Sequence, residues 1–101
     1  MDIEAIRAKI RSKRYSIHLH AFTEAFKDGL SIDDIIYTVL NGEIIEEYPE
    51  RARCLIYAML PSGIPVHIVV GYGWQEEIYI VTAYIPDNRE WIAFRIRRPR
   101  R

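Results

Sequence analysis

The stretch that decides the fold is residues 52–85. It reads ARCLIYAML at 52–60, IPVHIVVGY at 64–72 and EIYIVTAYI at 77–85. All three runs are rich in β-branched, aromatic and other apolar residues, which is the composition of β-strands. The connections between them are short, and short connections join antiparallel neighbours. This stretch therefore predicts three consecutive strands of an antiparallel meander.

Four further elements are predicted ahead of this meander. Glu43–Tyr48 has the character of a strand, and its acids and the proline after it suit the edge of a sheet. Apolar residues at helical spacing predict helices over 2–13, 16–29 and 31–42. The sequence thus predicts an α+β fold in which N-terminal helices pack on one face of a four-stranded antiparallel meander sheet.

Local signals mark the ends of two of these helices. Ser16 is predicted as the N-cap of the second helix, and Leu19, Phe22, Phe26 and Leu30 are spaced as an apolar stripe. The third helix should begin after Ser31, because an aspartate three residues further on can complete a capping box.

Length and composition indicate a single globular domain spanning residues 1–101. The chain has a mass of 11.9 kDa, and its residues are 50% hydrophobic and 28% charged, as in ordinary globular proteins. Cys54 is the lone cysteine, so no internal disulfide can form and a reducing compartment is expected. We see neither the apolar core of a signal peptide nor an apolar run long enough to cross a membrane. We therefore expect a soluble cytoplasmic protein.

The net charge of zero conceals basic ends and an acidic body. Residues 1–14 hold five bases against two acids, and residues 15–91 hold twelve acids against four bases. One interpretation is that the C-terminal arginines form a tail that binds nucleic acid. The other is that the basic ends fold back onto the acidic body or keep the chain soluble. The candidate nucleic-acid-binding residues are Arg95, Arg97, Arg98, Arg100 and Arg101.

His20 is the histidine best placed for proton transfer. On a helix, Glu24 would lie one turn further along and could orient the imidazole ring. The alternative is a histidine at a helix start that bonds the neighbouring backbone. His67 alternates with apolar residues in a predicted strand, which favours a half-buried histidine with satisfied nitrogens. The spacing of His18, His20 and His67 favours no metal site, and no motif predicts a cofactor.

Arg53, Thr82 and Tyr84 are the other candidates for a catalytic site. Thr82 and Tyr84 share one strand face, and Tyr84 stands at a strand end, where its hydroxyl could hold a phosphate or donate a proton. Both could equally be ordinary sheet residues. Arg51 and Arg53 could hold a phosphate, or could pair with acids of the adjacent strand, Glu46 and Glu47.

Several motifs in order resemble a known family. They are His20-Ala21, GLS at 29–31, NGEIIEEY at 41–48, GIPVHIVV at 63–70 and IVTAY at 80–84. Their order and spacing resemble the uncharacterised prokaryotic family called domain of unknown function 4258. The resemblance covers residues 16–91 and leaves the helix at 2–13 and the basic tail at 95–101 outside.

That family is remotely similar to RelE-like and BrnT-like toxin ribonucleases, which implies metal-independent cleavage of RNA. By this resemblance His20 would transfer the proton, with Arg53, Thr82 and Tyr84 in support, and an antitoxin-like protein would be the partner. The family commonly has a basic residue four positions after the histidine, where this chain has Glu24.

A non-catalytic protein-interaction or dimerisation module is the alternative function. Both faces of the predicted strands are apolar. We therefore expect helices to cover one face, and a terminal segment or a partner chain to cover the other. A homodimer is one expected form of such a module.

Overall fold

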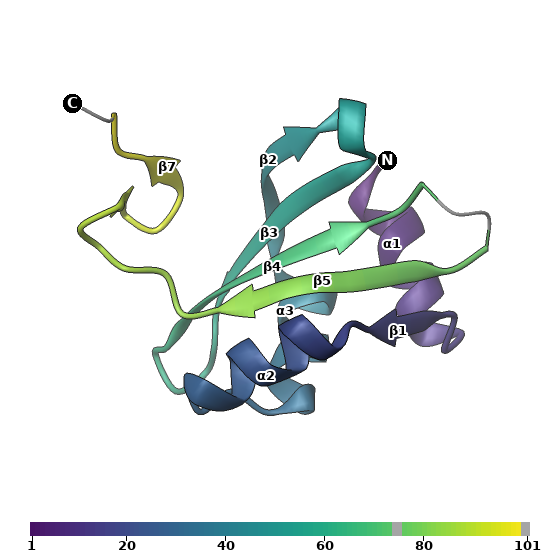
Figure 1. Ribbon diagram of the computed structural model, residues 1–101, viewed down its shortest axis with the longest axis horizontal. Coiled ribbons are helices and arrows are strands. Elements are labelled where there is room, and N and C mark those ends of the chain that lie inside the picture. Colours follow the sequence, from purple (N-terminus) through teal and green to yellow (C-terminus); the bar gives the residue numbers. More distant parts are fainter. Residues whose placement is uncertain (74–75, 100–101) are drawn as a thin grey trace.

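The computed structural model describes residues 1–73 and 76–99 (Figure 1). Within these residues the chain forms three helices, a five-stranded sheet and a small C-terminal hairpin. None of the described helices is both long and apolar enough to span a lipid bilayer. In chain order the elements are α1 (Ile3–Arg11), β1 (Tyr15–Ile17), α2 (Leu19–Lys27), α3 (Ile32–Asn41), β2 (Glu43–Tyr48), the 3-10 turn η1 (Pro49–Arg51), β3 (Arg53–Met59), β4 (Pro65–Gly71), β5 (Ile78–Tyr84), β6 (Trp91–Ile92) and β7 (Ile96–Arg97).

The α+β class is confirmed, but the sheet is mixed and has one strand more than predicted. Its strand order is β1-β5-β4-β3-β2, in which β2 to β5 are antiparallel and β1 lies parallel to β5. Ser16, predicted as an N-cap, lies instead in β1 opposite Tyr79, and His18 occupies the N-cap position of α2. A strand of three residues is too short to show the alternation of apolar and polar residues that predicts a strand. It is recognised only from its pairing with β5.

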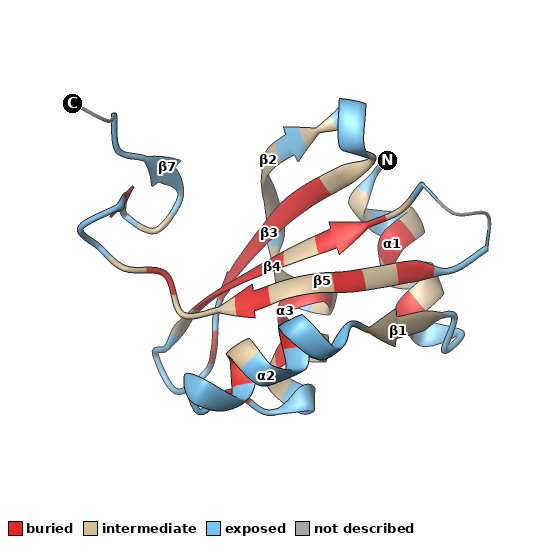
Figure 2. Ribbon diagram, viewed as in Figure 1, coloured by how far each residue is buried: buried red, intermediate tan, exposed pale blue. Residues whose placement is uncertain are grey.

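The helices cover one face of the sheet and enclose the main core. In Figure 1, α1 and α3 lie behind the central strands and α2 runs beside β5. Figure 2 shows the buried residues concentrated along the strands and on the helix sides that face them. The largest fully buried aliphatic side chains of this core are Ile6, Ile35, Val39, Ile56, Val66, Ile68, Val70, Ile78 and Ile80.

The predicted capping box of the third helix is confirmed. The backbone N–H of Asp34 donates to Ser31 Oγ at 3.0 Å, and the N–H of Ser31 donates to Asp34 Oδ2 at 2.9 Å. Two amides at the start of α3 are thereby satisfied, which fixes where the helix begins.

The predicted apolar stripe of the second helix does not face the core. Ala21 and Ala25 are the buried residues of α2, whereas Leu19, Phe22 and Phe26 are exposed; of the predicted stripe only Leu30, beyond the end of α2, is buried. Small residues face the sheet because α2 lies close beside β5. The spacing of the large side chains therefore indicated a helix correctly but assigned its buried side wrongly.

Two carboxylates, one in α2 and one at its C-cap, close the edge of β5 beyond the end of β1. Glu24 Oε1 accepts the backbone N–H of Ala83 at 3.0 Å, and Asp28 Oδ2 accepts that of Ile85 at 2.8 Å. The two acids are one helical turn apart. The two backbone N–H groups belong to residues two positions apart, so the acids satisfy alternate N–H donors along this edge. This arrangement protects an edge that would otherwise be open to another chain.

The C-terminal segment, residues 86–99, lies against the face of the sheet opposite the helices. Trp91 is buried there, with its ring perpendicular to that of His67 at a centroid distance of 4.5 Å. β6 and β7 pair with each other rather than with the main sheet, and Figure 1 shows this segment beyond the end of β5. A terminal segment of the chain thus covers part of the second face. This is one of the two alternatives expected from the apolar strands, the other being a partner chain.

Arg7 joins α1 to the C-terminal end of α3, and its removal should destabilise the fold. Its Nε donates to the carbonyl oxygen of Val39 at 3.2 Å, and its Nη2 donates to that of Gly42 at 2.5 Å. We expect Arg7→Ala to lower the free energy of unfolding by about 1–2 kcal/mol, because two helix-end carbonyls lose a charged donor. Urea denaturation measures this. Arg11→Ala, an exposed change on the same helix, is the control and should change stability by less than about 0.5 kcal/mol. Equal losses in the two variants would contradict the capping role.

Candidate functional site

An open hollow of about 360 Å³ lies on the sheet face opposite the helices, at the end where β5 begins. The segments around it are the β1–α2 junction, the η1 turn, the start of β3, the end of β4 and the start of β5. The side chains on it that can bind or transfer protons are His18, Glu50, Arg51, Arg53 and Tyr79.

The backbone at the start of α2 places His18 on this hollow. Its N–H donates to the carbonyl oxygen of Ile80 at 2.9 Å, which continues the alignment of β1 with β5 for one more residue. Its imidazole lies against the ring of Tyr79, with the centroids 5.3 Å apart and the planes tilted by 43°. Neither ring nitrogen bonds another described residue, and the side chain is exposed. The imidazole is therefore held by a ring contact while both nitrogens remain accessible.

The η1 turn delivers two arginines to the same hollow. Ala52, in the left-handed region at φ 51°, reverses the chain between Arg51 and Arg53. In the described part of the chain neither guanidinium forms an ion pair. The predicted pairing with Glu46 and Glu47 is therefore wrong, and the two guanidinium groups are available to an anion.

The acids of β2 are engaged elsewhere. Glu46 accepts hydrogen bonds from Arg97 and Tyr48, and the hydroxyl of Tyr72 donates to Glu47 at 3.4 Å. Burial alone would raise the pKa of Glu46, but the bonds from Arg97 and Tyr48 outweigh it and hold this pKa below its usual value. Glu46 is therefore a charged partner of the C-terminal segment.

Only one of the four residues predicted as catalytic, Arg53, lies on the hollow. The other three, His20, Thr82 and Tyr84, do not belong to the described residues that line it. His20 lies on the exposed side of α2, with its Nε2 3.8 Å from Glu24 Oε1. Tyr84 is level with Tyr57, four residues from Arg53 along β3 and therefore about 13 Å away in that direction. The structure does not bring the four together.

Tyr84 instead belongs to a buried network around His67. His67 Nε2 is 2.6 Å from the carbonyl oxygen of Phe94, and its Nδ1 is 3.1 Å from the hydroxyl of Tyr84. A carbonyl only accepts, so Nε2 carries the proton and Nδ1 accepts the tyrosine hydroxyl. Burial lowers the pKa of His67 and raises that of Tyr84 to about 12. His67 has satisfied nitrogens, as predicted, although it is fully rather than half buried.

Two of the predicted nucleic-acid-binding arginines form ion pairs within the chain. Arg95 Nε is 2.8 Å from Glu43 Oε1, and Arg97 Nη2 is 3.0 Å from Glu46 Oε1. Their guanidinium groups also lie over aromatic rings, that of Arg95 over Tyr57 and that of Arg97 over Trp91. Here the basic end does fold back onto the acidic body. Arg98 donates to the backbone oxygen of Asn88, and Arg100 and Arg101 lie outside the described residues.

Sequence reasoning missed His18 and Tyr79 as parts of one site. Had residues 15–17 been recognised as a strand, alternation would have placed Ser16 and His18 on the same sheet face as Tyr79. Within residues 1–73 and 76–99, no three histidine, cysteine, aspartate or glutamate side chains gather closely enough to hold a metal ion.

The fold and the hollow define a small α+β domain with an open site of arginine, histidine and tyrosine. The family model described as Domain of unknown function (DUF4258) matches residues 17–85. The chain belongs to this family, as its motifs indicated. Comparison with curated proteins and with solved structures gave no match.

Proposed function

We propose that this protein binds RNA in the hollow and cleaves its phosphodiester backbone without a metal ion. The observation that carries the proposal is the convergence of an accessible imidazole, two unpaired guanidinium groups and a phenol on one open surface. The guanidinium groups of Arg51 and Arg53 suit a phosphate, and the half-buried ring of Tyr79 offers a face for a base. This is the chemistry that the resemblance to RelE-like and BrnT-like toxin ribonucleases implies, with His18 in place of His20.

The reaction can be written with the groups on the hollow. His18 takes the proton of a ribose 2′-hydroxyl, and the 2′-oxygen attacks the adjacent phosphorus. The bond from phosphorus to the 5′-oxygen breaks as the Tyr79 hydroxyl gives its proton to that oxygen. Arg51 and Arg53 offset the negative charge that develops on the phosphoryl oxygens. The products are a 2′,3′-cyclic phosphate and a 5′-hydroxyl, and water returns the proton from His18 to Tyr79.

Cleavage of a single-stranded RNA by the purified full chain in EDTA tests this proposal. We expect products with cyclic phosphate ends, and we expect His18→Ala to reduce the rate by about 10²–10⁴-fold, as for loss of a general base. His20→Ala removes an exposed histidine two residues away and should leave the rate unchanged.

Two results would contradict the proposal. Loss of activity in His20→Ala but not in His18→Ala would place the chemistry on α2, away from the hollow. No cleavage by the folded wild-type protein would exclude the ribonuclease reaction under these conditions, whatever the variants do.

A further inference from the structure

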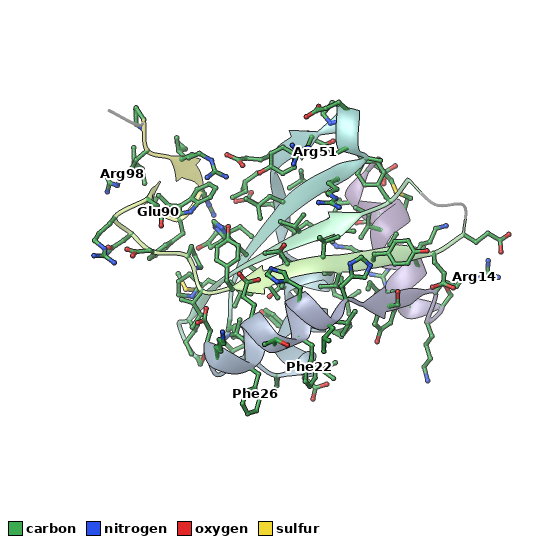
Figure 3. The ribbon with its side chains drawn as sticks, viewed as in Figure 1. Arg14, Phe22, Phe26, Arg51, Glu90 and Arg98 are labelled. Atoms are coloured by element: carbon green, nitrogen blue, oxygen red, sulfur yellow. The ribbon has the colours of Figure 1, made fainter. Side chains whose placement is uncertain are left out.

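We propose that the exposed side of α2 and the start of α3 form an interface between two copies of this chain. This inference goes beyond RNA cleavage and does not depend on it. The α2–α3 surface consists of Leu19, Phe22, Phe26 and Ile32, whose exposed fractions are 79%, 45%, 76% and 46%. Figure 3 shows Phe22 and Phe26 pointing from α2 away from the sheet. These four large apolar side chains form one contiguous patch rather than scattered exposure, and such patches often mark an interaction site.

The size of the α2–α3 surface suits a dimer of ordinary dimensions. A large apolar side chain contributes on the order of 150–200 Å² when fully covered, so the four exposed fractions amount to roughly 400 Å². A standard interface buries about 800 Å² per partner, of which somewhat more than half is non-polar. The exposed polar residues around the patch, Thr23, Lys27, Ser31 and Asp33, can supply the remainder.

The shape of the α2–α3 surface favours a second copy over an unrelated occupant. A groove of about 210 Å³ between α2 and α3 is walled by Phe22 and Phe26, with Ala25, Leu30 and Ile35 at its base. Leu19 projects from the same helix two turns before Phe26, or about 10 Å along its axis. When two α2 helices cross antiparallel near Thr23, Leu19 of each copy meets the groove of the other. One patch thus carries both a projecting side chain and a groove, as a two-fold interface requires.

The charged rim and the position of the hollow are compatible with this pairing. Lys27 and Asp33 give the rim both signs of charge, so two copies do not present only like charges to each other. The hollow with His18 and Arg53 lies on the sheet face opposite the helices, so pairing through α2 leaves it open. Dimerisation and RNA cleavage can therefore be tested separately.

Sedimentation equilibrium of the purified full chain over a range of concentrations tests the dimer. We expect a mass approaching twice 11.9 kDa as the concentration rises. Phe26→Glu should weaken association by roughly thirtyfold or more, the effect of losing an interface hot spot. Ile96→Glu, which changes another large apolar side chain, exposed to 63% on β7, should leave association unchanged.

Two outcomes would overturn the inference, provided that circular dichroism shows the variants folded. One is a mass of 11.9 kDa at every concentration, which would leave the surface to a different protein. The other is a dimer that Phe26→Glu does not weaken, which would place the interface elsewhere.

Discussion

Gly42→Ala is expected to destabilise this protein by about 3 kcal/mol or more, as severe overpacking does. A Cβ atom at Gly42 would lie 2.5 Å from the carbonyl oxygens of both Thr38 and Tyr57, and 2.8 Å from Cγ2 of Ile56. The first oxygen belongs to the last turn of α3 and the second to β3, so neither can rotate away as a side-chain end could. An added methyl group must therefore push the helix and the strand apart.

The expected loss of stability at Gly42 comes from the lack of room for a Cβ atom and not from the backbone angles. Gly42 has φ −90°, which any residue adopts, and its N–H donates to Thr38 at 2.8 Å. Thermal or urea denaturation measures the loss, which for a chain of this size corresponds to a fall in melting temperature of more than about 10 °C. Gly63→Ala is a matched control, since Gly63 has φ +88° and no atom within 4 Å of its Cβ position, and the strain should amount to about 1–2 kcal/mol. Equal losses in the two variants would show that close packing at Gly42 does not limit stability.

The long apolar strands and the capped third helix could be predicted from sequence because their signals are local. Residues 52–85 carry enough β-branched and aromatic residues to define three strands, and Ser31 with Asp34 defines a helix start without help from the rest of the chain. β1 could not be predicted in the same way. Its three residues are extended because β5 offers a free edge, and that pairing is a property of the assembled sheet.

The prediction of which side of α2 is buried was wrong for a related reason. Large apolar residues mark a helix core when there is room for them. Here α2 lies beside β5 closely enough for Glu24 and Asp28 to bond its amides, and only Ala21 and Ala25 fit between. Phe22 and Phe26 are therefore left exposed on the side of α2 that we propose as an interface.

The candidate site could be predicted only in its residue types. The predicted site combines a histidine, an arginine and a tyrosine, and of its members only Arg53 lies on the hollow. Arg53 was included, whereas His18 and Tyr79 meet because β1 aligns with β5, a contact that no local pattern reports. Tyr84 was assigned a catalytic role because it ends a strand, yet its hydroxyl bonds His67 beneath the C-terminal segment.

Acidification from pH 7 toward pH 5 is expected to destabilise the protein through His67. Burial lowers the pKa of His67 in the folded state below its ordinary value of 6.5. As the pH falls through about 6.5, the unfolded chain gains a proton at this residue before the folded protein does, so the free energy of unfolding decreases. The slope approaches about 1.4 kcal/mol per pH unit for one proton, and it vanishes below the folded-state pKa, where both states are protonated.

Urea denaturation at several pH values, on the wild type and on two variants, isolates this contribution. His67→Gln should be less stable at pH 7, by about 1–3 kcal/mol, because the bonds to Phe94 and Tyr84 are disturbed in a buried place. Its stability should nevertheless change less between pH 7 and pH 5 than that of the wild type. His20→Ala, which removes an exposed histidine, should keep the wild-type slope. If the pH dependence of the free energy of unfolding persists in His67→Gln, the acid sensitivity belongs to other groups. The buried imidazole, where the C-terminal segment meets the sheet, would then no longer need to be neutral.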